Sequence, residues 1–289
     1  MMRIEVDETN AKQRADVLVA NAATEYSRAA LAKLFTMGNV LLDGEVAKPG
    51  DKPKIGQVLQ VDLSPLEVEP DVIELPVLFE NADAIVVDKP AGVISHARGR
   101  YWQEASVASF IRAKTKDLSG ERAGIVHRLD RATSGVMIAA RNQATQTYLQ
   151  KEFADKRVQK EYIALVHGTP ELAEAHIVAP LARNPHVPQQ FRVDIGGKHA
   201  ETTYRVIETN GDVSLIALHP LTGRTHQLRL HMLHIGHPIV GDILYAPDKN
   251  NEERMYLHAH KLSIRLPGGA RHEFVAPLPK NFRKRLARG

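Results

Sequence analysis

The sequence predicts an α+β protein: a mixed, mostly antiparallel sheet with flanking helices, preceded by a smaller α+β domain. Three observations support this prediction. Short apolar runs typical of strands outnumber helical patterns after residue 78. Tight-turn dipeptides such as Asn210-Gly211 separate several of these runs, as they do in antiparallel hairpins. Residues 64–77, which include three prolines, have the composition of a linker between two domains.

The first 63 residues contain the elements of a small α+β domain. Ser27 is a suitable N-cap for a helix over residues 28–37, in which apolar residues at i, i+3 and i+4 share one face. Gly38 can end that helix. Asp43-Gly44 lies between two apolar stretches and predicts a tight hairpin, and residues 58–63 form a closing strand.

This arrangement resembles the S4 domain, a small RNA-binding module. The resemblance rests on Ser27-Arg28 before the helix, Gly38-Asn39-Val40 after it, and Asp43-Gly44 in the hairpin. It implies that basic residues of the helix, among them Arg28 and Lys33, contact RNA. Because residues 1–80 carry 8 Lys and Arg against 14 Asp and Glu, a small domain with solvated charges is the alternative.

The second part of the chain supplies most of the predicted strands. We expect a first domain over residues 1–63, a linker over 64–77 and a second domain over 78–289. The pairing of residues 202–207 with 214–219 around Asn210-Gly211 is the clearest hairpin. The other elements expected in this domain are strands over residues 84–88, 136–140 and 162–166, and a helix over 143–156.

The composition excludes several chemistries. The 289 residues contain no cysteine, which excludes disulfides, iron–sulfur clusters, cysteine-ligated zinc and thiol catalysis. Residues 1–10 lack the apolar core of a secretory signal, and the apolar run over residues 136–140 is too short to span a bilayer. We therefore expect a cytoplasmic protein without a membrane partner, and take a monomer as the default oligomeric state. Residues 81–289 carry 30 Lys and Arg against 20 Asp and Glu, which is compatible with a polyanionic partner.

The densest polar stretch of the chain surrounds Asp130. Arg128 and Arg131 flank this carboxylate, and His127 precedes it. Nearby guanidinium groups stabilise an ionised carboxylate, which can then act as a base or a nucleophile. A surface turn with structural ion pairs is the alternative interpretation.

A second polar stretch runs over residues 221–231. If residues 225–231 are helical, His226, Arg229 and Leu230 share one face. An arginine buried on that face would need a carboxylate partner, for which Asp130 is the obvious candidate.

A third candidate is Tyr162, which begins a predicted strand after Lys156, Arg157 and Lys160. An aromatic ring beside basic side chains suits the stacking of an unpaired base near phosphates. An ordinary tyrosine at the edge of the core is the alternative.

These stretches occur in one ordered series that resembles the RluA-type pseudouridine synthase family over nearly the whole chain. An S4 domain in front is common in that family. The matching blocks are residues 80–92, 127–135, 160–162, 197–202, 222–231, 236–242, 257–259 and 276–279. The stretch after Gly92, including Ser95, is less typical and is expected to differ in its RNA contacts.

The resemblance implies a pseudouridine synthase fold and the isomerisation of uridine to pseudouridine in RNA. It makes Asp130 the essential carboxylate, Arg229 its partner and Tyr162 the residue against the target base. Arg128 would fill the gap left in the RNA. Substrate binding is further assigned to Arg131, Lys160, Arg224, His226 and Leu228. The resemblance implies no metal or organic cofactor, and a large-subunit ribosomal RNA substrate with tRNA as the alternative.

Three other functions were weighed. His226, His231, His234 and His237 cluster in the sequence as zinc ligands can, but their spacing matches no strong metal motif. His127-Arg128-Leu129-Asp130 faintly resembles a kinase catalytic loop, without the accompanying phosphate-binding motifs. A non-catalytic RNA-binding protein would also explain the basic body and the basic residues 280–288.

Overall fold

The structure is a computed structural model that describes residues 1–68, 73–97, 104–116, 124–249 and 252–288, with residues 118 and 122. The chain divides into two compact units, one containing residues 1–68 and the other residues 73–96 and 105–288. Each unit has an apolar core of its own. No helix in the described part of the chain has the length and apolar content needed to cross a bilayer.

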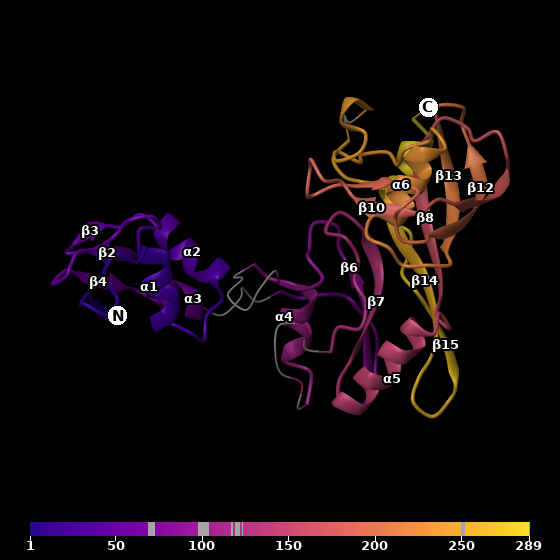
Figure 1. Ribbon diagram of the computed structural model, residues 1–289. Coiled ribbons are helices and arrows are strands. Elements are labelled where there is room, and N and C mark those ends of the chain that lie inside the picture. The colour runs from indigo at the N-terminus through magenta and orange to yellow at the C-terminus, as the bar shows by residue number, and fades with distance from the viewer. Residues whose placement is uncertain are drawn as a thin grey trace. The chain divides into compact units, whose positions relative to one another are not determined.

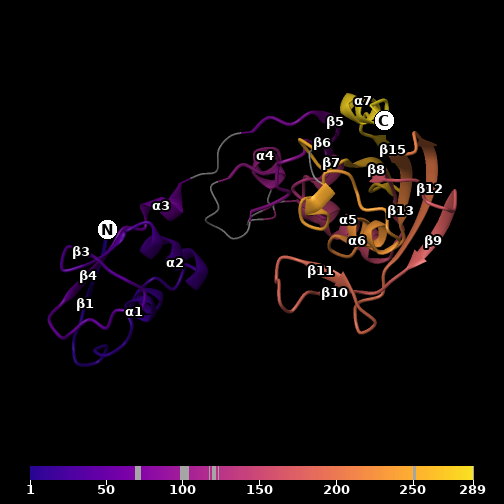
Figure 2. The same cartoon turned by 90° about the horizontal axis from the view of Figure 1, so that it is seen from above.

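The first unit is a four-stranded antiparallel sheet covered by helices. The sheet order is β1-β4-β2-β3. Its elements are β1 (Met2–Glu5), α1 (Ala15–Ala22), α2 (Arg28–Thr36), β2 (Val40–Leu42), β3 (Glu45–Val46), β4 (Val58–Val61) and α3 (Ser64–Glu67), which Figures 1 and 2 label.

The local signals of the first unit appear in the structure as expected. The Ser27 side chain accepts a hydrogen bond from the Ala30 N–H and caps α2. Asp43 and Gly44 have positive φ angles of 49° and 90°, as a tight hairpin between β2 and β3 requires. Part of the segment expected to be a linker is ordered, because α3 begins at Ser64 and buries Leu66 in this unit's core. We keep residues 64–77 as the proposed boundary region.

The second unit is built on one nine-stranded sheet, which confirms the predicted fold class. Its order is β5-β6-β7-β14-β8-β13-β12-β9, and β15 pairs with β14. All pairings are antiparallel except the one between β7 and β14. The strands are β5 (Val77–Glu80), β6 (Ala84–Lys89), β7 (Ser134–Ala140), β8 (Gln159–His167), β9 (Glu174–Val178), β12 (Glu201–Thr209), β13 (Val213–Pro220), β14 (Leu257–Arg265) and β15 (Arg271–Val275).

The remaining elements of this unit flank the sheet. A separate two-stranded hairpin, β10 (Leu181–Arg183) and β11 (Phe191–Val193), lies beside α6 (Figure 2). Helix α5 packs on β7 and β14 (Figure 1). The helices are α4 (Val107–Arg112), α5 (Gln143–Ala154), α6 (Gln227–His234) and α7 (Lys280–Leu286), with a 3₁₀ turn, η1 (Pro247–Lys249).

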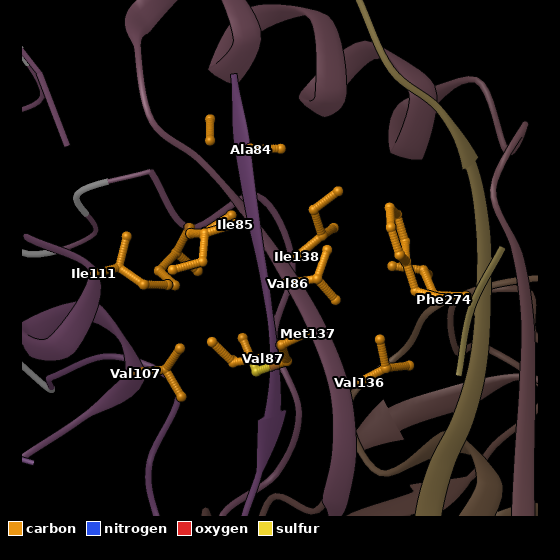
Figure 3. Packing of buried hydrophobic residues seen from close by; sticks show 14 of the residues in the cluster. Ala84, Ile85, Val86, Val87, Val107, Ile111, Val136, Met137, Ile138 and Phe274 are labelled. Atoms are coloured by element: carbon orange, nitrogen blue, oxygen red, sulfur yellow. The ribbon is translucent and has the colours of Figure 1, made fainter. Parts of the chain in front are cut away.

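The core of the first half of the sheet forms on both faces of β6 and β7. In Figure 3, Ile85 and Val87 lie on the side of Val107 and Ile111 of α4. Val86, Val136 and Ile138 lie on the opposite side, toward Phe274. Because side chains alternate across a strand, this continuous apolar sequence fills both faces. The start of β7 is therefore held rigidly, and Asp130 lies only four residues before it.

A single parallel seam joins the two halves of the sheet. At this seam Ser134 pairs with His258, and Gly135 with Ala259. A Cβ atom on Gly135 would lie 2.2 Å from the Ala259 carbonyl oxygen, so only glycine allows this approach. Ala259 is in turn paired with Tyr162, which places Tyr162 two strands away from the start of β7.

Candidate active site

A pocket of about 540 Å³ opens in the second unit, between the loop before β7, strand β8 and the start of α6. It brings together eight of the eleven residues that the sequence analysis assigned to catalysis or binding. These are Arg128, Asp130, Lys160, Tyr162, Arg224, His226, Leu228 and Arg229. Among the described residues that line the pocket, Asp130 is the single acidic one, whereas most of its polar neighbours carry or can carry positive charge. Such a pocket suits a polyanionic ligand.

The backbone around Asp130 is held from residues 89–95. The Ser95 hydroxyl donates to the Leu129 carbonyl at 2.7 Å and accepts from the Leu129 N–H at 3.0 Å. On the other side of Asp130, the Gly92 N–H donates to the Arg131 carbonyl at 2.7 Å. Ser95 is buried, so it is not one of the side chains of this less typical stretch that an RNA could contact directly. Its role is to fix the backbone beside the carboxylate.

Lys89 is a second support for this loop. Its side chain is fully buried, and Nζ donates to the carbonyls of Pro90, Val93 and Arg131 at 2.9, 2.7 and 3.3 Å. Burial lowers the pKa of Lys89 to about 7, although nearby Asp130 opposes this shift. The sequence analysis gave Lys89 no role, because the pattern of a strand ending in Lys-Pro does not reveal which carbonyls the lysine reaches.

The Asp130 carboxylate lies near two cationic or polar groups that approach the same oxygen. Arg229 Nη1 is 3.6 Å from Asp130 Oδ2, and His226 Nε2 is 3.8 Å from it. Among the described residues no hydrogen bond reaches Oδ1 of Asp130. Oδ2 is thus the oxygen nearest to both groups, at distances longer than a hydrogen bond, and the Asp130 side chain lines the pocket.

Arg229 has a closer partner than the one expected from the sequence. Its Nε and Nη2 atoms donate to the two carboxylate oxygens of Asp242 at 2.7 and 2.6 Å. Both side chains are buried, so this bidentate pair neutralises the guanidinium charge and fixes its plane. Asp130 was expected to be the partner of a buried Arg229; it is instead the more distant of two carboxylates.

The position of Asp242 depends on the residue before it. Gly241 has a φ of 77°, and a Cβ atom there would lie 1.9 Å from the Arg254 carbonyl oxygen. The Asp242 carboxylate also accepts from the N–H groups of Leu244 and Tyr245. No local pattern in the sequence indicates Asp242 as the close acidic partner of Arg229, because the contact depends on the course of an irregular loop.

The sequence analysis placed His226 on one helical face with Arg229 and Leu230 if residues 225–231 were helical. In the structure the helix begins after His226, so this shared face does not form. His226 precedes α6 in the left-handed conformation, with φ 56°. Its Nδ1 lies 2.6 Å from the Tyr245 hydroxyl, while Leu230 packs in a separate apolar cluster with Leu181. Burial lowers the pKa of His226, although Asp130 opposes this effect.

Tyr162 lies on β8 and lines the pocket. Burial, reinforced by the negative charge of Asp130, raises the pKa of the Tyr162 phenol, which therefore stays protonated near neutral pH. Lys160 lines the same pocket, and burial lowers its pKa. These two side chains form one wall, and Asp130 belongs to the facing loop.

Hydrogen bonds of the Gln227 side chain hold the segment over residues 221–226 in place. Its amide donates to the Glu201 carbonyl and the Thr202 hydroxyl, and its Oε1 accepts from Thr222 and from the Arg224 N–H. Arg224 is exposed at the rim, and its Nε donates to the His199 carbonyl at 3.0 Å. This rigid segment presents a cation at the pocket entrance.

The remaining assigned residues differ in their surroundings. Arg128 is exposed on the pocket lining, whereas Leu228 is largely buried in an apolar cluster with Met232. Arg131 is exposed but does not line the pocket, and its guanidinium donates to the Gly92 carbonyl at 3.4 Å. The other two assigned residues, Arg28 and Lys33, belong to the exposed side of α2 in the first unit.

The histidines weighed as zinc ligands bind different partners. His231 is hydrogen-bonded to the Thr202 hydroxyl and the Ala179 carbonyl, and His237 to the His167 carbonyl. Within the described ranges, no three histidine or carboxylate side chains are grouped so that they could hold a metal ion.

Comparison with known proteins identifies the family. The family model for RNA pseudouridylate synthase matches residues 83–234, which include the loop of Asp130, strand β8 and α6. A protein of Chloroflexus aurantiacus named as an uncharacterized RNA pseudouridine synthase is 37% identical over 286 residues, covering 96% of this chain and 90% of its own length. The ribosomal large subunit pseudouridine synthase D of Xanthomonas campestris is 34% identical over 301 residues, covering 98% and 90%.

A solved structure agrees with this result. Human RNA pseudouridylate synthase domain containing 1 superposes with a TM-score of 0.60 and 28% identity, over 73% of this chain and 86% of the human chain. The sequence-based resemblance to this family is confirmed, together with its fold. The chain belongs to the RNA pseudouridylate synthase family.

Proposed function

We propose that the chain isomerises specific uridines of large-subunit ribosomal RNA to pseudouridine, with Asp130 as the essential carboxylate. The observation that carries this proposal is the placement of Asp130 as the single acid of a basic pocket, 3.6 Å from a buried arginine. The name of the Xanthomonas campestris relative supports the choice of ribosomal RNA. The cytoplasmic location and the monomeric state expected from the sequence remain parts of the proposal.

The reaction exchanges one bond to the ribose for another. The bond from C1′ to N1 breaks, the uracil turns, and C5 bonds to C1′. N1 gains a proton and C5 loses one, so the atoms balance without a co-reactant. Asp130 either attacks C1′ or removes a proton from the sugar, and both routes need an ionised carboxylate.

Arg229 acts as the charge partner of that carboxylate. Its bidentate pair with Asp242 fixes the guanidinium, and Nη1 remains directed at Asp130 Oδ2. Because the arginine is buried and cannot be deprotonated in the working pH range, its positive charge is permanent. This charge stabilises the ionised form of Asp130 before the reaction and limits the movement of the Asp130 carboxylate during the reaction.

Tyr162 packs against the target base; it lines the pocket of Asp130, and its raised pKa keeps the phenol protonated. The target base must leave its stack before C1′ can be reached. Arg128, which is exposed at the pocket, fills the space that the base vacates. Lys160, Arg224 and Arg131 contact phosphates, and His226 and Leu228 complete the lining around the nucleotide.

The first unit is proposed to bind RNA outside the active site. Arg28 and Lys33 lie with Ala29 and Ala32 on the exposed side of α2, where both cations are accessible to a phosphate chain. Its overall acidic charge limits this contribution, so most of the electrostatic affinity is assigned to the second unit.

Pseudouridine mapping tests the proposal. Unmodified large-subunit ribosomal RNA and tRNA would be incubated separately with the wild-type chain and with Asp130→Asn, and carbodiimide labelling with reverse transcription would then locate pseudouridines. We expect stops at defined uridines of ribosomal RNA with the wild type and none with Asp130→Asn, because the near-isosteric amide cannot act as a carboxylate.

Asp155→Asn is a matched control, because Asp155 is exposed beyond the end of α5 and does not line the pocket. It should retain the wild-type pattern. If only tRNA is modified, the proposed substrate is wrong and the proposed reaction stands. Substantial activity of Asp130→Asn on either RNA would refute the catalytic assignment, and RNA binding without modification by the wild type would favour a non-catalytic protein.

A further inference from the structure

His226 is the second neighbour of Asp130, and the hydrogen bonds around His226 determine which of its ring nitrogens carries the proton. His226 lies between Tyr245 and Asp130: its Nδ1 is 2.6 Å from the Tyr245 hydroxyl, and its Nε2 is 3.8 Å from Asp130 Oδ2. The ring is held on two sides, by Phe191 and by Tyr245, each in an edge-on contact. The backbone of His226 is left-handed, and its side chain makes no capping hydrogen bond to the helix that follows.

The hydrogen bonds of Tyr245 determine which ring nitrogen carries the proton. The hydroxyl oxygen accepts from the Phe191 N–H at 2.9 Å, so its own hydrogen is available for one acceptor. Among the described residues the acceptor within hydrogen-bonding distance is Nδ1 of His226. Nδ1 is therefore the bare nitrogen, and the proton of a neutral ring is on Nε2.

The surroundings of Nε2 lead independently to the same tautomer. A bare Nε2 would direct its lone pair at the Asp130 carboxylate, which is repulsive, whereas an N–H there is attracted to it. Burial lowers the pKa of His226, which favours the neutral ring. Tyr245 itself is held by Arg229, whose guanidinium carbon lies 4.8 Å from the ring centre.

We propose that Tyr245 and His226 are positioning residues for the proposed reaction: Tyr245 fixes the Nε2–H tautomer of His226, and this N–H and Arg229 together hold Oδ2 of Asp130. Oδ1 is then left to face the reacting nucleotide. The proposal rests on the catalytic role proposed for Asp130. It assigns to Tyr245 a function that does not require contact with RNA.

Kinetics on an RNA fragment that contains a mapped site test the positioning role. Tyr245→Phe removes the hydroxyl and keeps the ring, and His226→Asn keeps a residue tolerant of positive φ but removes the donor at Nε2. We expect each variant to lower kcat about 10- to 100-fold, because a misplaced reacting group costs rate. The KM should stay nearly unchanged in Tyr245→Phe, since Tyr245 does not line the pocket, whereas His226→Asn also alters the lining and can raise the KM. The double variant should be no slower than the single ones.

Two further variants separate positioning from general damage. Tyr204→Phe is the matched control, because the Tyr204 hydroxyl donates to the Leu172 carbonyl at 3.2 Å, outside the pocket lining. It should keep the wild-type kcat. His226→Gln places an amide N–H near the position of Nε2 and should recover part of the rate lost in His226→Asn.

Nitrogen-15 NMR of histidine-labelled protein tests the tautomer without RNA. The His226 signals are identified by their absence in His226→Asn. We expect a proton on Nε2 and a bare Nδ1 in the wild type, and a mixture of tautomers in Tyr245→Phe. A proton on Nδ1 in the wild type would overturn the proposal, as would equal kcat values for Tyr245→Phe and Tyr204→Phe. If the wild type modifies no RNA, the proposed function fails, while the NMR result still decides the tautomer.

Discussion

Arg229 lies close to Asp242 and farther from Asp130. We expect the pairing with Asp242 to fix the orientation of Arg229, and thereby its contact with Asp130. Asp242→Asn removes one negative charge from the buried bidentate pair with Arg229. We expect a loss on the order of 3 kcal/mol in the free energy of unfolding, because a buried charge loses its partner. The kcat should also fall, since Arg229 is then free to tilt away from the geometry that serves Asp130.

Urea unfolding of the second unit and single-turnover kinetics would measure these two effects. Asp248→Asn is the control, because Asp248 is exposed in η1 a few residues further on. An unchanged kcat in Asp242→Asn would show that the orientation of Arg229 does not depend on Asp242.

His258 makes stability depend on pH. This residue is fully buried, with Nδ1 near the Ser134 hydroxyl and Nε2 near the Ala276 carbonyl, and burial lowers its pKa from 6.5 to about 4. Between these two values the unfolded chain binds a proton that the folded chain does not, so stability falls as the pH drops below 6.5. The contribution at pH 5 is about 2 kcal/mol.

Denaturant titrations at pH 7.5 and pH 5.0 would test this. The loss of stability between the two pH values should be smaller in His258→Gln than in the wild type. His234→Gln is suitable as a control because His234 is exposed. Equal losses in the wild type and His258→Gln would contradict the assignment.

At the level of single elements, the sequence predicts features that depend on neighbouring residues and does not predict pairings between residues far apart in the chain. Ser27 and Asp43-Gly44 act through neighbours within a few residues, so their patterns were sufficient to predict a cap and a hairpin. The hairpin between β12 and β13 was predicted for the same reason. The parallel seam between β7 and β14 joins residues more than 120 positions apart, and no local pattern encodes it.

The residues of the active site likewise fall into those that local sequence patterns indicate and those that they do not. Asp130, Tyr162 and Arg229 stand out because each lies in a dense polar stretch, their roles are those that the family resemblance implies, and the pocket brings them together. Asp242 and Tyr245 were not assigned roles, because their contacts depend on the course of an irregular loop. A buried carboxylate or hydroxyl in such a loop can be recognised only when the group opposite it is known.

The seam yields a prediction about β7 and β14 as a pair. In Gly135→Ala the new Cβ would meet the Ala259 backbone at 2.2 Å, so the strands must separate. Gly211→Ala is the matched control: it has a similar positive φ of 92°, but no atom lies within 4 Å of the added Cβ. Both variants carry backbone strain of about 1–2 kcal/mol, and only Gly135→Ala adds a steric clash.

Thermal unfolding and the yield of soluble protein would measure the difference. We expect Gly211→Ala to fold with a slightly lower Tm. Gly135→Ala should unfold at a much lower temperature or fail to accumulate as folded protein. Similar Tm values for the two variants would mean that β7 and β14 can move apart without loss.

For the whole molecule, the two units are proposed to divide catalysis and RNA capture. Replacing Arg28 and Lys33 together by alanine removes two cations from the first unit and none from the pocket. We expect weaker RNA binding and a smaller dependence of affinity on salt, by about one to two counterions in the logarithmic slope, with the main effect on KM rather than kcat.

Filter-binding titrations over a range of salt concentrations would measure the slope. Arg3→Ala, on the exposed side of β1, controls for the loss of a cation elsewhere in the same unit. If Arg28 and Lys33 can be replaced without any change in the slope, the first unit contributes through its fold rather than through these charges.

The seam between β7 and β14 also determines when the enzyme becomes competent during its own synthesis. Strand β14 lies between β7, which follows Asp130, and β8, which carries Tyr162. Within the described part of the sheet, β14 is the strand that pairs with both halves, so we expect the carboxylate and the tyrosine to take fixed positions only after β14 has been synthesised. We therefore expect a nascent chain that already contains Asp130, Tyr162 and Arg229 but lacks β14 to be inactive, so that modification of RNA starts only late in translation.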